Sequence, residues 1–328
     1  MSSPKRIILF ICILIVSVYI PLALYKFENT SHKITDISNE TDAVKILSFN
    51  IRVKALDFGI NTWENRKNKV IGTLNFYDPD LIGFQEDEDS QVNFLRENLP
   101  EYQAVYDERD YDKKFSNNAI FFRKTIFKLI DNGMLWLSET PNKPSKSWGV
   151  RTTRTMTYAK LEYLQLKKTV IVINVHLDNR SKEHRINSAG IINNFLQKYN
   201  PENYDVIITG DFNEGIAQPT QREFIKYGFN DTWTYCYVRS CCSYKDVFMS
   251  FHGFLGNTIN NKFLKPLVYL ANTYQGGELP SHYGYFVDWI LYKGDNIIPV
   301  YIHLINNHDS TGIYSSDHFP IFSVFRFS

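Results

Sequence analysis

The sequence predicts an α/β domain in which strands alternate with helices in the first half and strands close the second half. One observation is the short run at 206–209, which is typical of a buried strand and stops at Gly210. Another is the segment 63–77, where apolar side chains recur at helical spacing. The third is composition, because 328 residues with 44% hydrophobic and 15% aromatic side chains can build one large core, as in a sandwich or a barrel.

The other elements follow from local patterns. Strands are expected at 44–49, 81–84, 117–122, 157–164, 169–175, 205–209, 286–292 and 321–325. Helices are expected at 63–77, after a cap at Asp89 or Ser90, after a cap at Ser181, and after the capping-box pattern Thr220-Gln221-Arg222-Glu223. Residues 138–150 are expected to form a loop, and residues 229–285 are the least regular part of the chain.

Polar side chains follow several of these strands. They are Asn50, Glu86, His176 with Asp178, and Asp211 with Asn213. Strand ends often carry the chemistry of an open sheet, because the sheet fixes the backbone while the loop exposes the side chains. A carboxylate and a carboxamide at 211 and 213 can accept a proton from one substrate and donate a hydrogen bond to it. An ordinary turn is the alternative, since Gly, Asp and Asn favour turns.

Later residues complete a candidate site. Asp288 lies in an apolar strand, where an unpaired carboxylate is costly, and we expect His318 to be its partner. Asp317 precedes this histidine. Arg151 and Arg154 lie at the entry to the strand at 157–164 and could bind phosphate in bidentate fashion, although Arg151 also fits an ordinary exposed cation.

The N-terminus predicts a membrane segment. Lys5 and Arg6 precede an apolar run at 7–25, close to the roughly 20 residues of a spanning helix. We expect residues 1–6 in the cytoplasm, an uncleaved anchor at 7–25, a stalk at 26–43 and a catalytic domain at 44–328 that is lumenal or extracellular. A cleaved signal peptide, giving a secreted protein, is the alternative.

The cysteines fit an oxidising compartment. Cys236, Cys241 and Cys242 form a local cluster, in which Cys236 could pair with either of the others. A zinc site is the weaker reading, because no fourth ligand of usual spacing is near.

The charge balance excludes a global basic field. Lys plus Arg number 36 against 35 Asp plus Glu, for a formal charge of +1, which gives only modest support to a nucleic-acid substrate.

Six short motifs in order resemble the endonuclease/exonuclease/phosphatase superfamily, the deoxyribonuclease I-like group. They are Ser-Phe-Asn50, Gly-Phe-Gln-Glu86, Asn-Val-His176, Gly-Asp211-Phe-Asn213, Val-Asp288-Trp-Ile and Ser-Asp317-His318. Compact hydrolase-like members are similar at Trp-Glu-Asn-Arg-Lys (63–67), Leu-Ser-Glu-Thr-Pro (137–141), Arg154-Thr155 and His252-Gly253-Phe254. The resemblance covers about residues 44–328. It implies a four-layer α-β-β-α sandwich of two mixed, mostly antiparallel sheets.

The resemblance implies a Mg²⁺- or Mn²⁺-dependent phosphoesterase that uses in-line attack by an activated water. Hard oxygen ligands suit these cations, so Glu86 is the expected ligand, supported by Asn50 and Asp317. The expected catalytic residues are Asp211 as base, Asn213, His176, Asp288 and His318. Arg154, Arg151, Asp178 and His252 are expected to contact substrate phosphate. The expected substrate is nucleic acid, a phospholipid head group or a small phosphate ester, with a non-catalytic binding module on the same fold as the alternative.

Overall fold

The computed structural model describes residues 43–106, 117–239, 249–256, 286–306 and 312–328. The predicted anchor at 7–25, almost all of the predicted stalk, and Cys241 and Cys242 lie outside these residues. Within the described residues, no helix is long and apolar enough to cross a membrane. The membrane segment and the cysteine pairing therefore stay predictions from the sequence.

Two six-stranded sheets form the centre of the molecule. The first has the order β11-β12-β1-β2-β4-β3 and the second β5-β6-β7-β8-β10-β9. The strands of the first sheet are β1 (Ala43–Asn50), β2 (Leu81–Gln85), β3 (Tyr102–Val105), β4 (Ile120–Arg123), β11 (Ile297–Leu304) and β12 (Ile321–Phe327). Those of the second are β5 (Phe127–Trp136), β6 (Thr155–Tyr163), β7 (Lys168–His176), β8 (Asp205–Asp211), β9 (Asn230–Asp231) and β10 (Asp288–Lys293).

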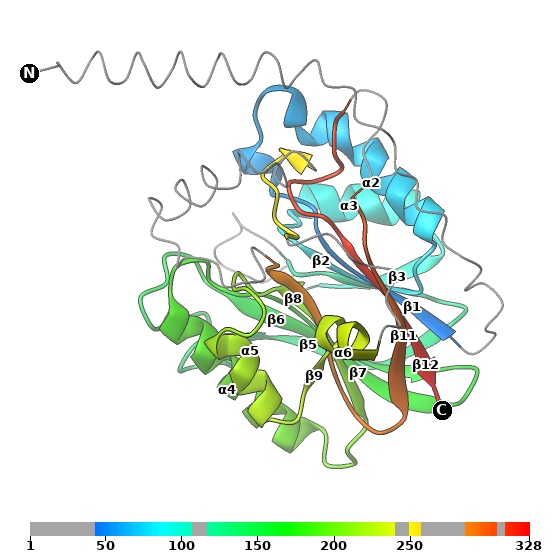
Figure 1. Cartoon of the computed structure of the whole chain (residues 1–328), viewed down its shortest axis with the longest axis vertical. Coiled ribbons are helices and arrows are strands. Elements are labelled where there is room, and N and C mark those ends of the chain that lie inside the picture. Colours follow the sequence, from blue (N-terminus) through cyan, green and yellow to red (C-terminus); the bar gives the residue numbers. More distant parts are fainter. Residues whose placement is uncertain (1–42, 107–116, 240–248, 257–285, 307–311) are drawn as a thin grey trace, which may run out of the picture.

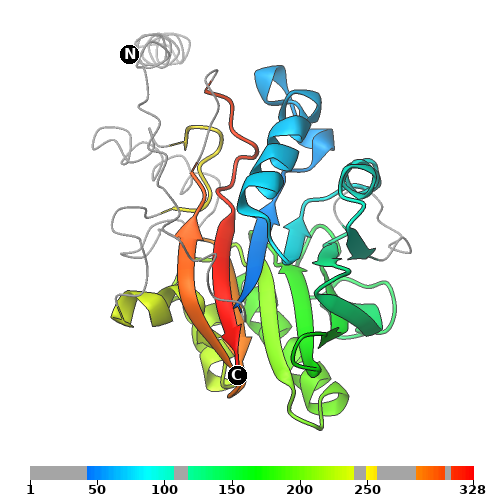
Figure 2. The ribbon, with the colours of Figure 1, turned by 90° about the vertical axis from the view of Figure 1, so that its right-hand side faces the viewer.

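Both sheets are mixed and mostly antiparallel. Only β1 with β2, and β7 with β8, run parallel among the described strand pairs. Figure 2 shows β11, β12 and β1 side by side, so the end of the chain lies beside its first strand. Each parallel pair is joined by a helix, as a crossover connection requires.

Helices cover the outer faces of the two sheets (Figure 1). On the first sheet lie α2 (Trp63–Tyr77) and α3 (Asp89–Asn98), after two short 3-10 turns at Lys54–Leu56 and Gly59–Asn61. On the second lie α4 (Lys182–Tyr199) and α5 (Pro219–Lys226), while α6 (Thr232–Arg239) contacts β10 and β11. The predicted layered sandwich is therefore present in the described residues.

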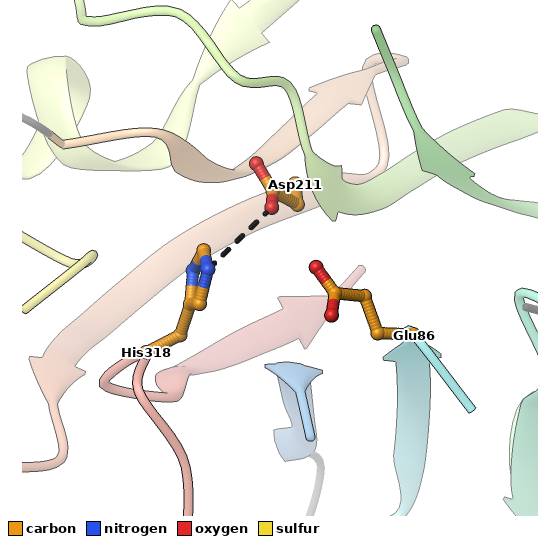
Figure 3. A group of neighbouring side chains, drawn as sticks. All are labelled: Glu86, Asp211 and His318. Carbon is orange, nitrogen blue, oxygen red and sulfur yellow. Dashed lines mark ion pairs between the residues drawn. The ribbon is translucent and has the colours of Figure 1, made fainter. Parts of the chain in front are cut away.

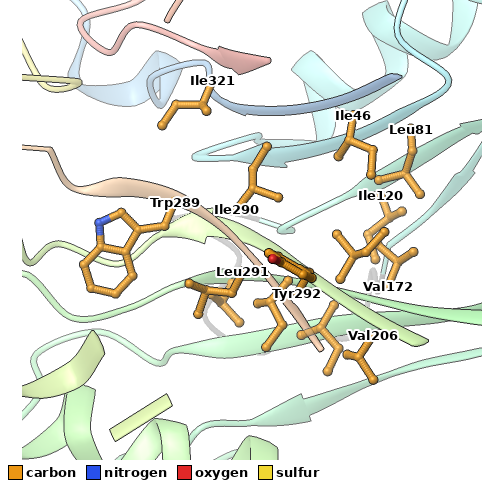
Figure 4. Close-up of a cluster of buried hydrophobic side chains, with 14 of the residues drawn as sticks. Ile46, Leu81, Ile120, Val172, Val206, Trp289, Ile290, Leu291, Tyr292 and Ile321 are labelled. Atoms are coloured by element: carbon orange, nitrogen blue, oxygen red, sulfur yellow. The ribbon is translucent and has the colours of Figure 1, made fainter. Parts of the chain in front are cut away.

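The alternation of side chains along β1 shows how the layers are built. Leu47 and Phe49 join the core beneath α2 and α3, whereas Val44 and Ile46 join the core between the sheets. Figure 4 shows this inter-sheet core, in which Ile46 lies near Val172 of β7 and Ile290 of β10. Because the period of a strand is two, Asn50 points to the same inter-sheet face as Ile46.

A polar cluster interrupts this core just before the strand ends. Asn174 of β7 donates to the backbone oxygens of Phe84 (2.6 Å) and Ala119 (3.1 Å) in the opposite sheet. Its Oδ1 accepts from Gln85 Nε2 at 2.7 Å and Thr209 Oγ1 at 3.0 Å. These buried groups satisfy one another and pin the two sheets together directly under the polar strand ends.

The absence of a side chain at Gly83 allows the sheets to approach here. A Cβ at this position would lie 2.0 Å from Thr209 Oγ1 and 2.7 Å from Asn174 Oδ1. Since real atoms cannot approach so closely, any larger residue at 83 would push the two sheets apart at this level.

Several sequence predictions of element ends were wrong. The helix expected after Asp89 or Ser90 is capped by Glu88, and Gln218 rather than Thr220 precedes α5. Strands β3, β5 and β11 were not predicted, nor were strand β9 and helix α6 in the segment expected to be irregular. The other predicted strands and helices are present with shifts of a few residues.

Candidate active site

Three polar residues of the second sheet lie side by side on adjacent strands. Asp211 ends β8 and pairs in register with His176, which ends β7, and with Asp288, which begins β10. Paired residues point to the same face, and Thr209 shows that this face looks toward the other sheet. All three side chains are buried. The strand ladder therefore fixes the positions of this half of the site.

The first sheet contributes Asn50 and Glu86. Asn50 ends β1, and Glu86 follows β2 with a left-handed backbone (φ 59°). Simple alternation would turn Glu86 away from the second sheet, because Gln85 already points to it. The left-handed turn instead brings the carboxylate back to the site, where Oε2 accepts from Val53 N–H at 3.0 Å.

The segment at 312–320 supplies Asp317 and His318. Ser316 fastens it by donating from Oγ to the Asn50 carbonyl at 2.6 Å. His318 Nδ1 lies 2.9 Å from Asp288 Oδ2, so the predicted pairing of Asp288 with His318 is present. Asp317 forms an ion pair with Arg52, with 3.0 Å between Oδ2 and Nη1.

These segments meet around the carboxylate of Asp211. Its Oδ2 accepts from Asn50 Nδ2 at 2.9 Å and lies 3.6 Å from His176 Nε2 and 3.8 Å from His318 Nε2. Asn50 Nδ2 is also 3.2 Å from Glu86 Oε1. Figure 3 shows Glu86, Asp211 and His318 converging on one point from both sheets. Residues far apart in sequence thus lie within contact distance of one carboxylate.

The two histidines have opposite electrostatic surroundings. Burial and the nearby Arg154 guanidinium lower the pKa of His176 to about 3. Burial also opposes protonation of His318, but the Asp288 and Asp211 carboxylates prevail and raise its pKa to about 10. At neutral pH the site therefore holds one neutral and one cationic imidazole.

The carboxylates differ in the same way. Burial and repulsion by Asp288 raise the pKa of Asp211 to about 7. Burial would also raise that of Glu86, but His176, His318 and the Val53 N–H outweigh it and lower the pKa to about 2. Glu86 is thus a permanent anion, whereas Asp211 lies close to its titration point.

The donor set fits a hard divalent cation. One ligand atom from each of Glu86, Asp211 and His318 lies within 4.8 Å of the others. Carboxylate oxygens are the donors that Mg²⁺ and Mn²⁺ prefer, and a cation here would balance the excess of buried acids. Of the other predicted ligands, Asn50 presents Nδ2 to the carboxylates while its Oδ1 accepts from Arg52 N–H, and Asp317 is engaged by Arg52.

Some predicted phosphate contacts lie at the rim of the site. Arg154 is close enough to His176 to lower the pKa of that histidine. The Nε of Arg154 lies 3.5 Å from Asp178 Oδ2. Asp178 in turn accepts from the backbone N–H groups of Arg180 and Ser181, so it orients the rim rather than facing the centre. Asn213 donates from Nδ2 to the Leu177 carbonyl at 3.0 Å.

Arg151 and His252 are not brought into the centre. Arg151 is exposed in the loop before β6. His252 is buried and stacks on Phe319, with 3.9 Å between ring centroids, while its Nδ1 accepts from Gly256 N–H. Its backbone N–H donates to the Asp317 carbonyl, so His252 supports the segment behind the site.

Arg52 is a site residue whose role was not predicted from the sequence. Its left-handed backbone (φ 64°) and its ion pair with Asp317 place it beside Asn50 and Glu86. The available signal was its position two residues after Asn50. A charged residue two positions after a polar strand end is a candidate partner for the acids of the same site.

Two facing sheets with outer helices, and acids and imidazoles converging at the ends of the central strands, define an α/β sandwich with a polar site between its sheets. The model of the Endonuclease/Exonuclease/phosphatase family matches residues 47–318. The chain therefore belongs to this family, and the resemblance seen in the sequence is confirmed. Members of the family are phosphoesterases and related hydrolases, which supports a hydrolase here.

Known proteins extend the comparison. An uncharacterized protein of Acanthamoeba polyphaga mimivirus is 28% identical over 166 residues, a match that spans 46% of this chain and 59% of that relative. A mannosyl-6-phosphatase of Bacteroides thetaiotaomicron superposes with a TM-score of 0.70 at 22% identity, over 87% of this chain and 100% of that one. D. rerio TDP2, complexed with a single-strand DNA product, gives 0.61 at 19% identity, over 87% and 99%. At these identities the two structures show a common fold.

Proposed function

We propose that the chain is a metal-dependent phosphoesterase that hydrolyses a phosphodiester or phosphomonoester. Family membership supports hydrolysis in general. The observation that carries the finer proposal is the buried Asp211 carboxylate, which lies 2.9 Å from Asn50 Nδ2 and within 4 Å of both His176 Nε2 and His318 Nε2. A base in reach of groups that recognise a phosphoryl centre suits attack by water.

The proposed reaction transfers one proton and exchanges one bond at phosphorus. Asp211 holds a water and accepts its proton as the water oxygen bonds to phosphorus. The ester P–O bond breaks on the opposite side, as in-line displacement requires, and the leaving oxygen takes up the proton that Asp211 returns through solvent. Asn50 keeps the Asp211 carboxylate oriented through its Nδ2.

The surrounding residues would bind the charge that develops on the phosphoryl oxygens. His318, held by Asp288, supplies a cation, and Arg154 supplies a guanidinium at the rim beside His176. Glu86 would hold Mg²⁺ or Mn²⁺, which would neutralise phosphate charge and stabilise the leaving oxygen when bound. Asn213 can donate to the substrate if it exchanges its bond to Leu177.

Three substrate classes remain for the test: nucleic acid, a phospholipid head group and a small phosphate ester. A panel for the domain at 44–328 consists of single-stranded and plasmid DNA, sphingomyelin and phosphoinositide vesicles, sugar phosphates, and bis-nitrophenyl phosphate. We expect turnover of one class with Mg²⁺ and its loss in EDTA.

Asp211→Ala and His318→Ala separate catalysis from binding. We expect both variants to stay folded by circular dichroism and to lose turnover. Turnover that survives both changes would contradict the assignment. Tight binding of a panel member without turnover by the unaltered chain would favour the binding module.

We also propose that residues 7–25 anchor the chain with its catalytic domain outside the cytosol. The support is the apolar run behind Lys5 and Arg6. Protease protection in membrane vesicles and N-terminal sequencing of the mature chain test this, since a cleaved N-terminus would favour secretion instead.

A further inference from the structure

Arg66 of α2 is a completely buried guanidinium at the back of the site. Its Nε donates to the Asn61 carbonyl at 2.7 Å, and its Nη2 donates to both carboxylate oxygens of Asp57, at 2.9 and 3.1 Å. Its Nη1 donates to the carbonyls of Ile51 and Ser315, each at 2.8 Å. These five contacts engage all three nitrogens of the guanidinium.

The partners of Arg66 belong to the segments that carry the site. Ile51 directly follows Asn50, and Ser315 comes two residues before Asp317. The guanidinium carbon also lies 5.4 Å from the ring centroid of Phe254, in the segment whose His252 N–H binds the Asp317 carbonyl. One planar group therefore joins three segments that are far apart in sequence.

The two bonds of Nη1 matter most for the geometry. A single nitrogen, Nη1, binds the carbonyls of Ile51 and Ser315, each at 2.8 Å. It therefore fixes the spacing between the backbone after Asn50 and the backbone that leads to Asp317. The bond from Ser316 Oγ to the Asn50 carbonyl is a second tie between the same two segments. No strand ladder pairs residues 50 and 51 with residues 315–318 in the described part of the chain.

We infer that Arg66 is a positioning residue that sets the placement of Asp317 and His318 relative to Asn50 and Glu86. The inference rests on the proposed function and extends it to a residue that touches no reacting group. Lysine cannot replace arginine here, because an ammonium has three donors and no planar fork. The Arg66 side chain thus positions the site residues of the loops, just as strand register positions those of the second sheet.

The test compares Arg66→Met and Arg66→Lys with Leu74→Ala, a buried core change on the same helix that leaves the five bonds intact. The Arg66 variants and Leu74→Ala are compared at a similar loss in melting temperature. We expect Arg66→Met to lower kcat by about 100-fold, the scale of a small misplacement of catalytic groups. Arg66→Lys should recover part of that loss, and Leu74→Ala should stay within about 3-fold of the unaltered chain at a comparable loss in melting temperature.

Two further measurements do not depend on turnover. Mn²⁺ titration should show weaker binding in Arg66→Met than in Leu74→Ala. Amide hydrogen exchange should rise at 50–53 and 312–318 in the Arg66 variants and stay unchanged there in Leu74→Ala. If Arg66→Met does not fold, Arg66→Lys carries the same comparison.

The outcomes separate the two proposals. If the unaltered chain turns over none of the panel, the proposed function fails, and Mn²⁺ affinity with exchange still decides the role of Arg66. If the Arg66 variants and Leu74→Ala lose kcat, Mn²⁺ affinity and exchange protection to the same extent at matched stability, Arg66 is an ordinary core residue and the inference is wrong.

Discussion

The two sheets hold their parts of the candidate site in different ways. In the second sheet His176, Asp211 and Asp288 are positioned by strand register, so backbone hydrogen bonds on both sides of β8 fix them. In the first sheet Glu86 and His318 lie in turns beyond the strands and depend on individual side-chain bonds. Many backbone hydrogen bonds maintain strand register together, whereas one substitution can remove a side-chain bond that holds a turn in place. The first-sheet half should therefore be the more sensitive to single changes nearby.

The largest effect should come from Glu86→Gln, which tests the turn-held half directly. The change keeps the shape and removes the permanent negative charge, so cation binding and phosphate neutralisation should both weaken. We expect activity to fall by about 100-fold or more, corresponding to several kcal/mol. Mg²⁺ titration calorimetry together with kcat/KM checks this. Unchanged Mg²⁺ affinity would contradict the role of Glu86.

A smaller effect is expected from Asp288→Asn, which removes the charge that holds His318 across the two halves. The amide can still accept a hydrogen bond from Nδ1, but a buried imidazolium loses its main counter-charge. We expect kcat to fall by about 10- to 100-fold through misplacement of His318. Steady-state kinetics at saturating substrate measures this. If kcat were unchanged while KM rose, Asp288 would matter for binding alone.

Asn174→Ala tests how much the hydrogen bonds of Asn174, which form a bridge between the two sheets, contribute to stability. The change removes one buried partner each from Gln85, Thr209 and the carbonyls of Phe84 and Ala119, and we expect the free energy of unfolding to fall by about 2–4 kcal/mol. Urea unfolding measures the loss. Val172→Ala, on the same face of β7, is the apolar control. A loss below that of the control would show that the bridge adds little stability.

The smallest effect concerns His184, a buried residue of α4 near the rim. Its Nε2 lies 3.0 Å from the Leu137 carbonyl, in the segment 137–141 singled out by the sequence. Burial lowers its pKa from 6.5 to about 4 in the folded chain. Between these values only the unfolded chain takes up this proton, so the free energy of unfolding falls as pH drops from about 6.5 to about 4.

We expect this histidine to account for about 1–3 kcal/mol of that acid-induced loss. His184→Gln should flatten the pH dependence of unfolding by this amount in urea titrations at pH 7 and pH 4.5. An identical pH dependence in the variant would show that His184 does not contribute.

The parts of the fold that could be predicted were those with a clear period. The strand β8 and the helices α2 and α4 follow their apolar patterns almost to the residue. β5 was missed because it lies at a sheet edge and contains Asp131, Asn132 and Gly133 around an irregular register, a composition typical of a turn.

Two other elements were missed for related reasons. The strand β11 contains Pro299 at a shift in register. The helix α6 is composed largely of aromatic and β-branched residues, which favour strands, and its position beside β10 and β11 decides its conformation.

The residues of the candidate site also divide into those that could be predicted from the sequence and those that could not. Asp211 and His176 could be found because a polar residue ending an apolar run is visible in a sequence, and the pairing of Asp288 with His318 followed from the cost of a buried charge. The hydrogen bonds of Arg66 and the bridge at Asn174 could not be predicted, because both depend on carbonyl groups brought near only by the folded chain. The periodicity of apolar residues reveals the buried faces and the ends of strands and helices. It does not reveal which distant backbone group a side chain will contact.

The left-handed backbone shared by Arg52, Glu86 and Asn213 has a consequence for engineering. A residue with a Cβ loses about 1 kcal/mol or more in this conformation, and glycine does not. Variants selected for heat resistance alone should therefore accumulate glycine at these three positions, and each gain in melting temperature there would remove a side chain of the candidate site.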